Sequence, residues 1–234
     1  MIVAAMIGGF LQSSTGFGYS LVCMTIYSYF LPIKEAIVLQ AFVAMFTIAY
    51  YTFLQFKHIN FRLFIIPALF SIVTTYIGTE LVYIGSEEIL KKVLGITFIL
   101  LTIASVTIFK RIKISKGIGG MFVAGSVSGL IGGLTNLSGP PMVIYYLQVT
   151  NDKNEYNGTI QAFFLVSTVF KTIINVSNGL VTSEILAMTP LLLLGTAIGS
   201  YFGIKLFRNM NMEMIKVLVN SLMIFVGLYY TFIA

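Results

Sequence analysis

Long apolar runs dominate this sequence and restrict it to folds that a lipid bilayer can hold. Six of them are about as long as the roughly 20 apolar residues that a helix needs to cross a bilayer. They cover residues 36–56, 63–84, 89–109, 158–181, 185–206 and 213–233. Because 58% of the residues are hydrophobic, 9% are charged and the mean hydropathy is +0.96, we predict an all-α polytopic protein of the cell membrane.

The remaining composition excludes several classes of function. A single cysteine, Cys23, cannot form an internal disulfide, and a single histidine, His58, cannot build a site of several metal ligands. We therefore predict no metal site and no cofactor. The net charge of +6 comes from Lys and Arg in short loops between apolar runs, which is typical of membrane insertion and does not indicate a nucleic-acid partner.

Two further apolar segments, 1–31 and 118–148, are too long for one crossing and too short for two. Small and polar residues interrupt both, as "GGFLQSSTGFG" at 8–18 and "SGLIGGLTNLSG" at 128–139. Polar or non-helical backbone inside a membrane must face protein or a watery cavity, because lipid offers no hydrogen bonds. Both interruptions are therefore predicted to face the interior of the molecule.

The chain also contains an internal duplication. "LQAFVAMFTI" at 39–48 matches "IQAFFLVSTV" at 160–169, and "TYIGT" at 75–79 matches "TAIGS" at 196–200, both at an offset of 121. We predict two repeats, 1–114 and 115–234, within one membrane domain. The interrupted segments then occupy equivalent positions, and paired Gly/Pro-interrupted segments indicate a transporter's binding site.

The path of the interrupted segments determines the topology. If both cross the membrane, seven Lys and Arg residues lie on one side and six on the other; if both are re-entrant hairpins, the division is ten against three. The second division obeys the positive-inside rule and assigns the ten to the cytoplasm. Each half is then a hairpin plus three transmembrane helices, and the repeats are inverted. A broken helix that crosses fully also fits 31 residues.

Helix starts are predicted at both interruptions. Ser138 and Gly139 before Pro140 are typical of a helix N-terminus, and Ser14-Thr15-Gly16 is interpreted as its counterpart. Two helix N-termini near the midplane would attract an anion. Because the two prolines lack N–H donors, side chains of the second interruption are expected to supply them.

The run 158–181 carries a polar face. Gln161, Phe164, Thr168, Lys171, Asn175 and Asn178 recur there at steps of three and four residues. Lys171, near mid-span, costs at least ~2.5 kcal/mol to insert, so it is expected to face a cavity, a partner or an anion. The alternative is structural pairing with an acid, although Glu80, the one acid inside a span, sits near its end.

These arguments define a candidate substrate site with no catalytic residues. Its predicted members are Gln12, Ser13, Ser14, Thr15, Gly16, Gly18, Gln40, Thr135, Asn136, Ser138, Gly139, Pro140, Gln161, Lys171 and Asn175. Isolated glycines such as Gly78 and Gly199 are predicted to serve helix packing instead.

Two other classes of function compete with transport. An intramembrane hydrolase could use Ser13, Ser14 or Ser138 as nucleophile, but no His or paired Asp lies in a span to activate it. A passive scaffold would not need paired breaks or a buried lysine. Anion flux in liposomes would separate transport from both.

The segments "GGFLQSSTGFGYSLV" and "GLIGGLTNLSGPPMVIYYL" resemble the sulfite exporter TauE/SafE family of anion transporters, and the resemblance covers essentially the whole chain. It implies movement of small sulfur-containing or carboxylated anions, typically sulfite and sulfonates, across the cytoplasmic membrane. The implied partners are a small anionic substrate and the lipid bilayer, and the sequence leaves a homo-oligomer open. We expect alternating access around a midplane site.

Overall fold

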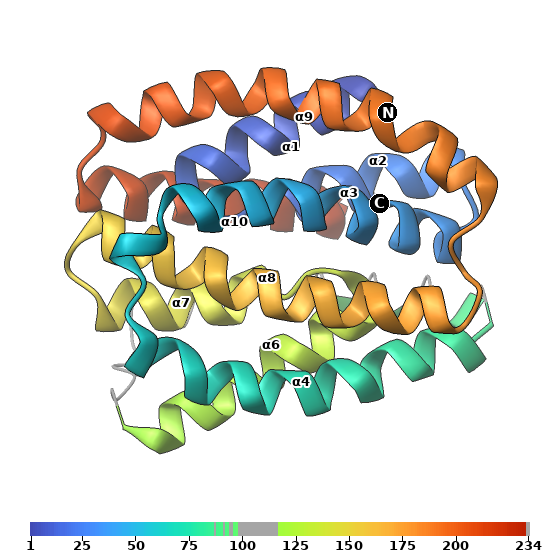
Figure 1. Cartoon of the computed structure of the whole chain (residues 1–234), viewed down its shortest axis with the longest axis horizontal. Coiled ribbons are helices and arrows are strands. Elements are labelled where there is room, and N and C mark those ends of the chain that lie inside the picture. The colour runs from blue at the N-terminus through green and yellow to red at the C-terminus, as the bar shows by residue number, and fades with distance from the viewer. Residues whose placement is uncertain (87, 91, 94–95, 98–116, 233–234) are drawn as a thin grey trace.

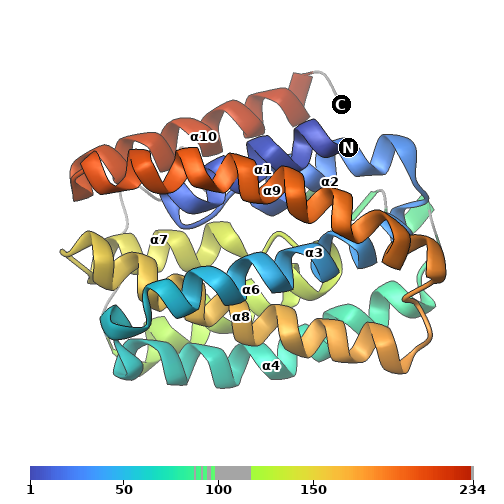
Figure 2. The same ribbon diagram turned by 45° about the horizontal axis from the view of Figure 1, so that its top comes forward.

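The described part of the chain is a bundle of helices that run side by side. The computed structural model describes residues 1–86, 88–90, 92–93, 96–97 and 117–232, and this part contains no strand. The long helices lie roughly along one common direction (Figures 1 and 2). Large apolar side chains cover the outside, including Phe53 at 79% and Tyr201 at 68% exposure. An apolar surface of this extent suits lipid rather than water.

Four of the six predicted spans are confirmed as helices that are long and apolar enough to cross a membrane: α3 (Ile33–Leu54), α4 (Phe61–Ile84), α8 (Lys153–Ser177) and α9 (Ser183–Asn209). α6 (Ile118–Thr135), which belongs to the second interrupted segment, is also long and apolar enough. The predicted run 213–233 forms α10 (Met212–Phe232). The predicted span 89–109 lies mostly outside the described residues.

The first interrupted segment is a helical hairpin. It consists of α1 (Ile2–Thr15) and α2 (Tyr19–Phe30). At the turn, the amide of Tyr19 donates to Oε1 of Gln12 at 3.4 Å, and further along Sγ of Cys23 lies 3.7 Å from the carbonyl of Ala4. The end of α1 therefore lies beside the start of α2, and the start of α1 lies beside a later part of α2, so the two helices are antiparallel.

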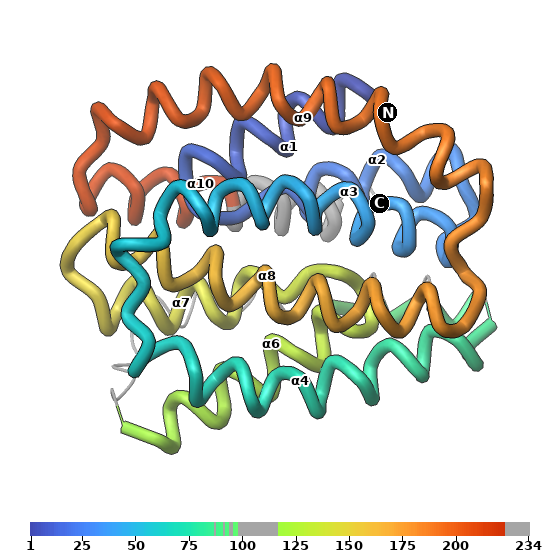
Figure 3. Tube along the Cα trace, in the orientation of Figure 1, coloured from blue at the N-terminus to red at the C-terminus, as the bar shows by residue number. Residues whose placement is uncertain are grey.

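The second interrupted segment is also a hairpin, formed by α6 and α7 (Gly139–Val149). Its two outer ends both lie near the start of α4, because Gly125 packs on Pro67 and the Tyr146 hydroxyl donates to the carbonyl of Leu63 at 3.2 Å. The two hairpins open toward opposite ends of the bundle, α1–α2 to the right and α6–α7 to the left in Figure 3.

Glycines let each hairpin approach a long helix of the other half. Three glycines spaced four residues apart in α9 face α1, and three at the same spacing in α6 face α4: Gly195, Gly199 and Gly203, and Gly125, Gly129 and Gly133. A Cβ at Gly199 would overlap the carbonyl of Met6, and one at Gly78 would lie 2.6 Å from the carbonyl of Leu130. The packing role predicted for Gly78 and Gly199 is confirmed, because backbone meets backbone there.

The described basic loops gather at one end of the bundle. The short helix η1 (Phe56–His58) lies beside Gly158 in the first turns of α8. Next to it, Nζ of Lys153 donates to the carbonyls of Phe207, Arg208 and Met210 at 3.2, 3.0 and 2.5 Å. This end therefore carries the loops 55–60, 150–153 and 207–211, as the hairpin topology requires.

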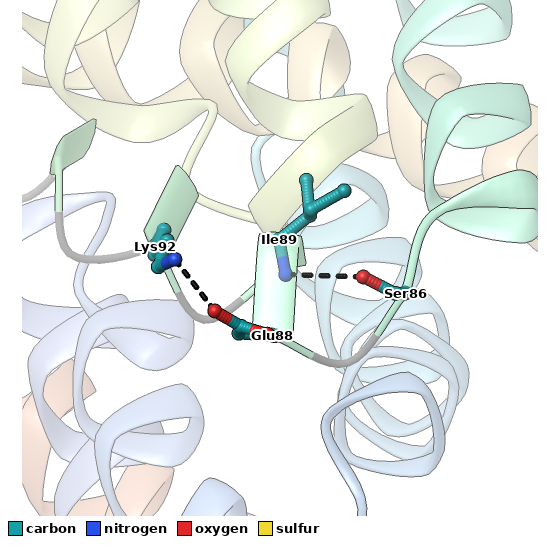
Figure 4. Close-up of polar contacts among 4 residues, drawn as sticks. All are labelled: Ser86, Glu88, Ile89 and Lys92. Carbon is teal, nitrogen blue, oxygen red and sulfur yellow. Dashed lines mark hydrogen bonds and ion pairs between the residues drawn. The ribbon is translucent and has the colours of Figure 1, made fainter.

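The opposite end holds the loops that follow α2, α4 and α8. Nζ of Lys34 donates to the carbonyl of Tyr83 at 3.0 Å. Just beyond α4, the Ser86 hydroxyl accepts from the amide of Ile89, and Lys92 pairs with Glu88 at 2.6 Å (Figure 4). This ion pair is exposed, so it contributes little stability.

Candidate functional site

Both hairpins turn in the same way. Gly16 ends α1 with φ of 85°, and Asn136 ends α6 with φ of 63°. In each case the preceding threonine donates to a carbonyl one turn back at 2.8 Å and accepts an amide from beyond the turn at 3.3 Å: Thr15 at the first tip, Thr135 at the second. Glycine and asparagine are the residues that tolerate this left-handed conformation.

This geometry corrects one expectation. Ser14-Thr15-Gly16 was predicted to start a helix, and that prediction is wrong, because these residues end α1. The Ser14 hydroxyl donates back to the carbonyl of Phe10 at 2.8 Å. Gly16 supplies the left-handed position that commonly follows a helix, and the next helix begins at Tyr19.

The helix start predicted at the second interruption is confirmed. α7 begins at Gly139, directly after Ser138, with Pro140 and Pro141 in its first turn. Proline is favoured there because the amides of the first turn have no partner within the helix. The Ser138 side chain makes no capping bond, which leaves its hydroxyl free for another partner.

The two tips meet around one cavity. A Cβ at Gly139 would lie 2.9 Å from the ring of Phe17, so the tips are in contact. The two hairpin tips and the helices α3, α4 and α8 all line this cavity. The lining residues are Gln12, Phe17, Gly18, Ser20, Leu21, Gln40, Ala41, Ala44, Ile48, Thr75, Gly132, Asn136, Leu137, Ser138, Gly139, Pro140, Phe164, Ser167, Thr168 and Lys171. Its free space of about 40 Å³ exceeds the roughly 10–15 Å³ needed for one water. It suits a few waters or a small ion.

Lys171 is the cation of this cavity. Its side chain is 3% exposed, and Nζ donates to the carbonyls of Gly132 and Gly133 at 2.9 and 2.6 Å. These carbonyls belong to the C-terminal end of α6, where the helix dipole favours positive charge. An ammonium has three N–H groups, so one donor is left for an anion.

The structural partner of Lys171 is therefore the backbone at the end of α6, and not Glu80, the acid named as the alternative partner. The described residues contain one ion pair, Lys92 with Glu88, and it does not involve Lys171. Glu80 instead lies 3.5 Å from Nδ2 of Asn178, about two turns further along α8. The ammonium group of Lys171 is hydrogen-bonded by backbone carbonyls and not by a carboxylate of the described residues.

A glutamine pair fixes the first hairpin against α8. Nε2 of Gln12 donates to Oε1 of Gln161 at 3.0 Å and to the carbonyl of Gly16 at 3.1 Å. Nε2 of Gln161 in turn donates to Oδ1 of Asn157 at 3.2 Å. Buried amides with satisfied partners hold a position well, so this network sets the height of the first tip beside the cavity.

Gln40 is held on one side only. Its Nε2 donates to Oγ of Ser20 at 2.9 Å, whereas its Oε1 is buried without a hydrogen-bond partner in the described structure. The residue is 1% exposed and lines the cavity. A buried oxygen without a hydrogen-bond partner lowers the stability of the folded protein, so a ligand that donates to it would gain a favourable bond.

The structure brings eight of the fifteen predicted residues to the cavity: Gln12, Gly18, Gln40, Asn136, Ser138, Gly139, Pro140 and Lys171. The other seven do not line it: Ser13, Ser14, Thr15, Gly16, Thr135, Gln161 and Asn175. Most of these support the hairpin tips through hydrogen bonds to nearby backbone. Asn175 differs, because its Nδ2 is buried without a partner in the described structure. A substrate-binding role stays a prediction for the whole set.

Sequence reasoning missed several lining residues. Ser20 opens α2, Thr75 lies on α4, and Ser167 and Thr168 lie on α8. Thr168 was placed on the polar face of its helix, and that pattern could have included it. Thr75 gave no signal of its own, because a threonine inside a span usually bonds to its own backbone.

Asn136 has a structural role that the sequence did not reveal. Its Nδ2 donates to the carbonyl of Ile37 in α3 at 2.6 Å. The second hairpin tip is thereby attached to the helix that also carries Gln40. In the described residues no group of three or more His, Cys, Asp and Glu side chains could hold a metal ion.

The fold and site together define a multi-pass membrane transport protein, in which two hairpins from opposite ends enclose a polar cavity. The family model described as Sulfite exporter TauE/SafE matches residues 1–230, and the chain belongs to that family. It is a family of membrane transporters for sulfite and other anions, not of enzymes. Comparison with curated proteins and with solved structures gives no significant match.

Proposed function

We propose that this protein moves a small sulfur-containing or organic oxyanion, of the sulfite or sulfonate kind, across the cytoplasmic membrane. The observation that carries this proposal is the cavity at the meeting point of two opposed hairpin tips, with Lys171 on its wall. A charge inside a span is expensive unless function or a partner requires it. Here the partner leaves one ammonium donor unused.

The lining chemistry favours an oxyanion. Besides Lys171, the hydroxyls of Ser138 and Thr168 line the cavity and donate to no described residue. The N-terminal ends of α2 and α7 also border it through Gly18 and Gly139, and helix N-termini attract negative charge. Several donors around a small space fit an ion with several oxygen atoms.

Alternating access follows from the way in which the halves pack. The proposed repeats, 1–114 and 115–234, exchange hairpins: α1 packs along α9 of the second repeat, and α6 packs along α4 of the first. By the offset of 121, α4 and α9 are equivalent helices. This reciprocal packing supports an inverted repeat, in which rocking of one unit against the other opens the cavity to either side.

The proposed orientation places the basic end in the cytoplasm. The loops that contain Lys57, Lys153 and Arg208 share that end of the bundle. Positive loops stay on the cytoplasmic side during insertion.

Flux through reconstituted protein tests the function. Purified full-length protein in liposomes should carry radiolabelled sulfite or a sulfonate down its gradient, with saturation and with inhibition by unlabelled anion. Empty liposomes provide the control. Well-folded protein that carries no such anion in either orientation would overturn the proposal, and a scaffold role would then fit better.

A further inference from the structure

Gln40 lines the cavity, and its buried Oε1 has no hydrogen-bond partner in the described structure. We infer that Gln40 accepts a hydrogen bond from the substrate itself, so that the site selects an oxyanion that still carries an O–H group. This inference rests on the proposed function and names the substrate class of the same cavity. It says that, within the proposed class, the site prefers protonated monoanions such as hydrogensulfite over sulfonates, which carry no O–H, and over fully ionised dianions.

The internal duplication provides a comparison for this residue. Gln40 and Gln161 are equivalent at the offset of 121. Both are buried, at 1% and 0% exposure, and both are hydrogen-bonded to the first hairpin, Gln40 to Ser20 in α2 and Gln161 to Gln12 in α1. The oxygen of Gln161 is satisfied by Gln12, whereas that of Gln40 has no partner in the described structure. The amide oxygen therefore has no described partner at the position in the first repeat, and it is hydrogen-bonded at the equivalent position in the second repeat.

The two hairpins differ at the position of Gln12. Gly16 and Asn136 hold equivalent turn positions, so the residue of the second hairpin that corresponds to Gln12 is Gly132. Gly132 lines the cavity and has no side chain to offer to Gln40. A Cβ at Gly132 would lie 2.6 Å from Cβ of Ser138, so Ser138 occupies the place where a second glutamine would begin, and no second amide in the described structure pairs with Gln40.

The substrate's proton matches this acceptor. A carbonyl oxygen repels the lone pairs of a fully ionised oxyanion, but it accepts a bond from an O–H group. Lys171, Ser138 and Thr168 can then serve the remaining oxygens as donors. A monoanion also needs less compensating charge than a dianion, and Lys171 is the cation that lines this cavity in the described structure.

Ser20 is the hydrogen-bond partner of the Gln40 amide in the structure. Its oxygen accepts from Nε2 of Gln40 at 2.9 Å, which directs Oε1 away from it. In the reverse orientation the Ser20 hydroxyl would donate to Oε1, and the NH₂ group would face the cavity. That arrangement would favour anions without a proton, so ligand preference distinguishes the two.

Two probes of equal charge and similar shape test the inference. The protonated monoanion of methylphosphonate carries one O–H, and methanesulfonate carries none. Binding of each to the purified full-length protein is measured by calorimetry, at a pH below the second ionisation of methylphosphonate. We expect the phosphonate to bind about tenfold more tightly, because an acceptor that is otherwise unpaired gains a partner.

Matched variants assign the preference to one atom. Gln40→Met should reduce the ratio of the two affinities to about one, since it keeps the length and removes the acceptor. Gln55→Met, the control at the C-terminal end of the same helix and away from the cavity, should keep the ratio. Equal or tighter binding of methanesulfonate by the wild type would overturn the inference, as would an unchanged ratio in Gln40→Met.

The wild-type comparison needs no variant to fold, so it can overturn the inference by itself. A preference for methanesulfonate leaves the proposed anion transport intact and removes only the role of Gln40. Failure of sulfite and of both probes to bind would remove the proposed site, and the inference with it.

Discussion

At the scale of single residues, the cavity depends on side chains that do two tasks at once. Asn136 supplies a left-handed turn and holds α3 through the carbonyl of Ile37. Lys171 lines the cavity and satisfies two carbonyls at the end of α6. Substitutions at these positions are therefore expected to change stability as well as the proposed binding, and paired variants are needed to separate the two effects.

Lys171 is predicted to contribute its charge to anion affinity. Lys171→Met keeps length and apolar bulk, whereas Lys171→Arg keeps the charge with a different arrangement of donors. We expect affinity for sulfite to fall in the order wild type, Arg, Met, with Met at least about tenfold weaker, since a bond to a charged group contributes roughly 1.5–3 kcal/mol. Thermal shift with sulfite measures this order. Unchanged affinity in a folded Lys171→Met protein would show that the lysine serves only the end of α6.

Asn136 is predicted to matter for both its backbone and its side chain. Asn136→Leu places a bulky residue at φ of 63° and should cost about 1–2 kcal/mol more stability than Asn136→Gly. Asn136→Gly keeps the turn but removes the bond to Ile37, so it isolates the side chain. Chemical unfolding in detergent compares the two variants. Equal stability of Leu and Gly variants would contradict the strain at this turn.

At the scale of elements, the sequence revealed both interruptions but not the geometry within them. The helix start at Gly139 could be predicted because two prolines follow Ser138, a local signal. The first tip was misread because Ser-Thr-Gly suits a helix end as well as a start, and only the left-handed Gly16 decides between them. The bond from Lys171 to α6 joins residues about 40 positions apart, and no local pattern predicts such a contact.

The glycine contacts between α1 and α9 are predicted to be essential for assembly. Gly199→Ala puts a methyl group into the carbonyl of Met6 and should destabilise the protein by about 1–3 kcal/mol, as overpacking does. Gly119→Ala is the matched control, since a Cβ there meets nothing within 4 Å. Thermal unfolding in detergent reports both. A neutral Gly199→Ala would mean that the two helices can move apart without cost.

At the scale of the whole molecule, the structure has two different ends, and the orientation can be tested directly. His58→Cys and Asn154→Cys lie at the basic end, and Ser86→Cys and Ser183→Cys at the other. An impermeant thiol reagent on intact cells should label only the second pair. The native Cys23 is fully buried and should stay unlabelled. The predicted cytoplasmic segment 110–116 lies outside the described residues. Labelling of Asn154→Cys from outside would reverse the orientation.

The exchange of hairpins between the two halves has a consequence for biosynthesis. Phe10 in α1 packs on Gly203 in α9, so the first hairpin lacks its partner until about 190 more residues have been made. At roughly 5–20 residues per second, this interval lasts about ten to forty seconds. For most of that time the polar turn at Gln12 and Gly16 has no α8 to cover it, and α9 arrives last. The nascent hairpin must therefore wait in the insertion machinery or at the membrane surface, and the last helices complete the fold of the first.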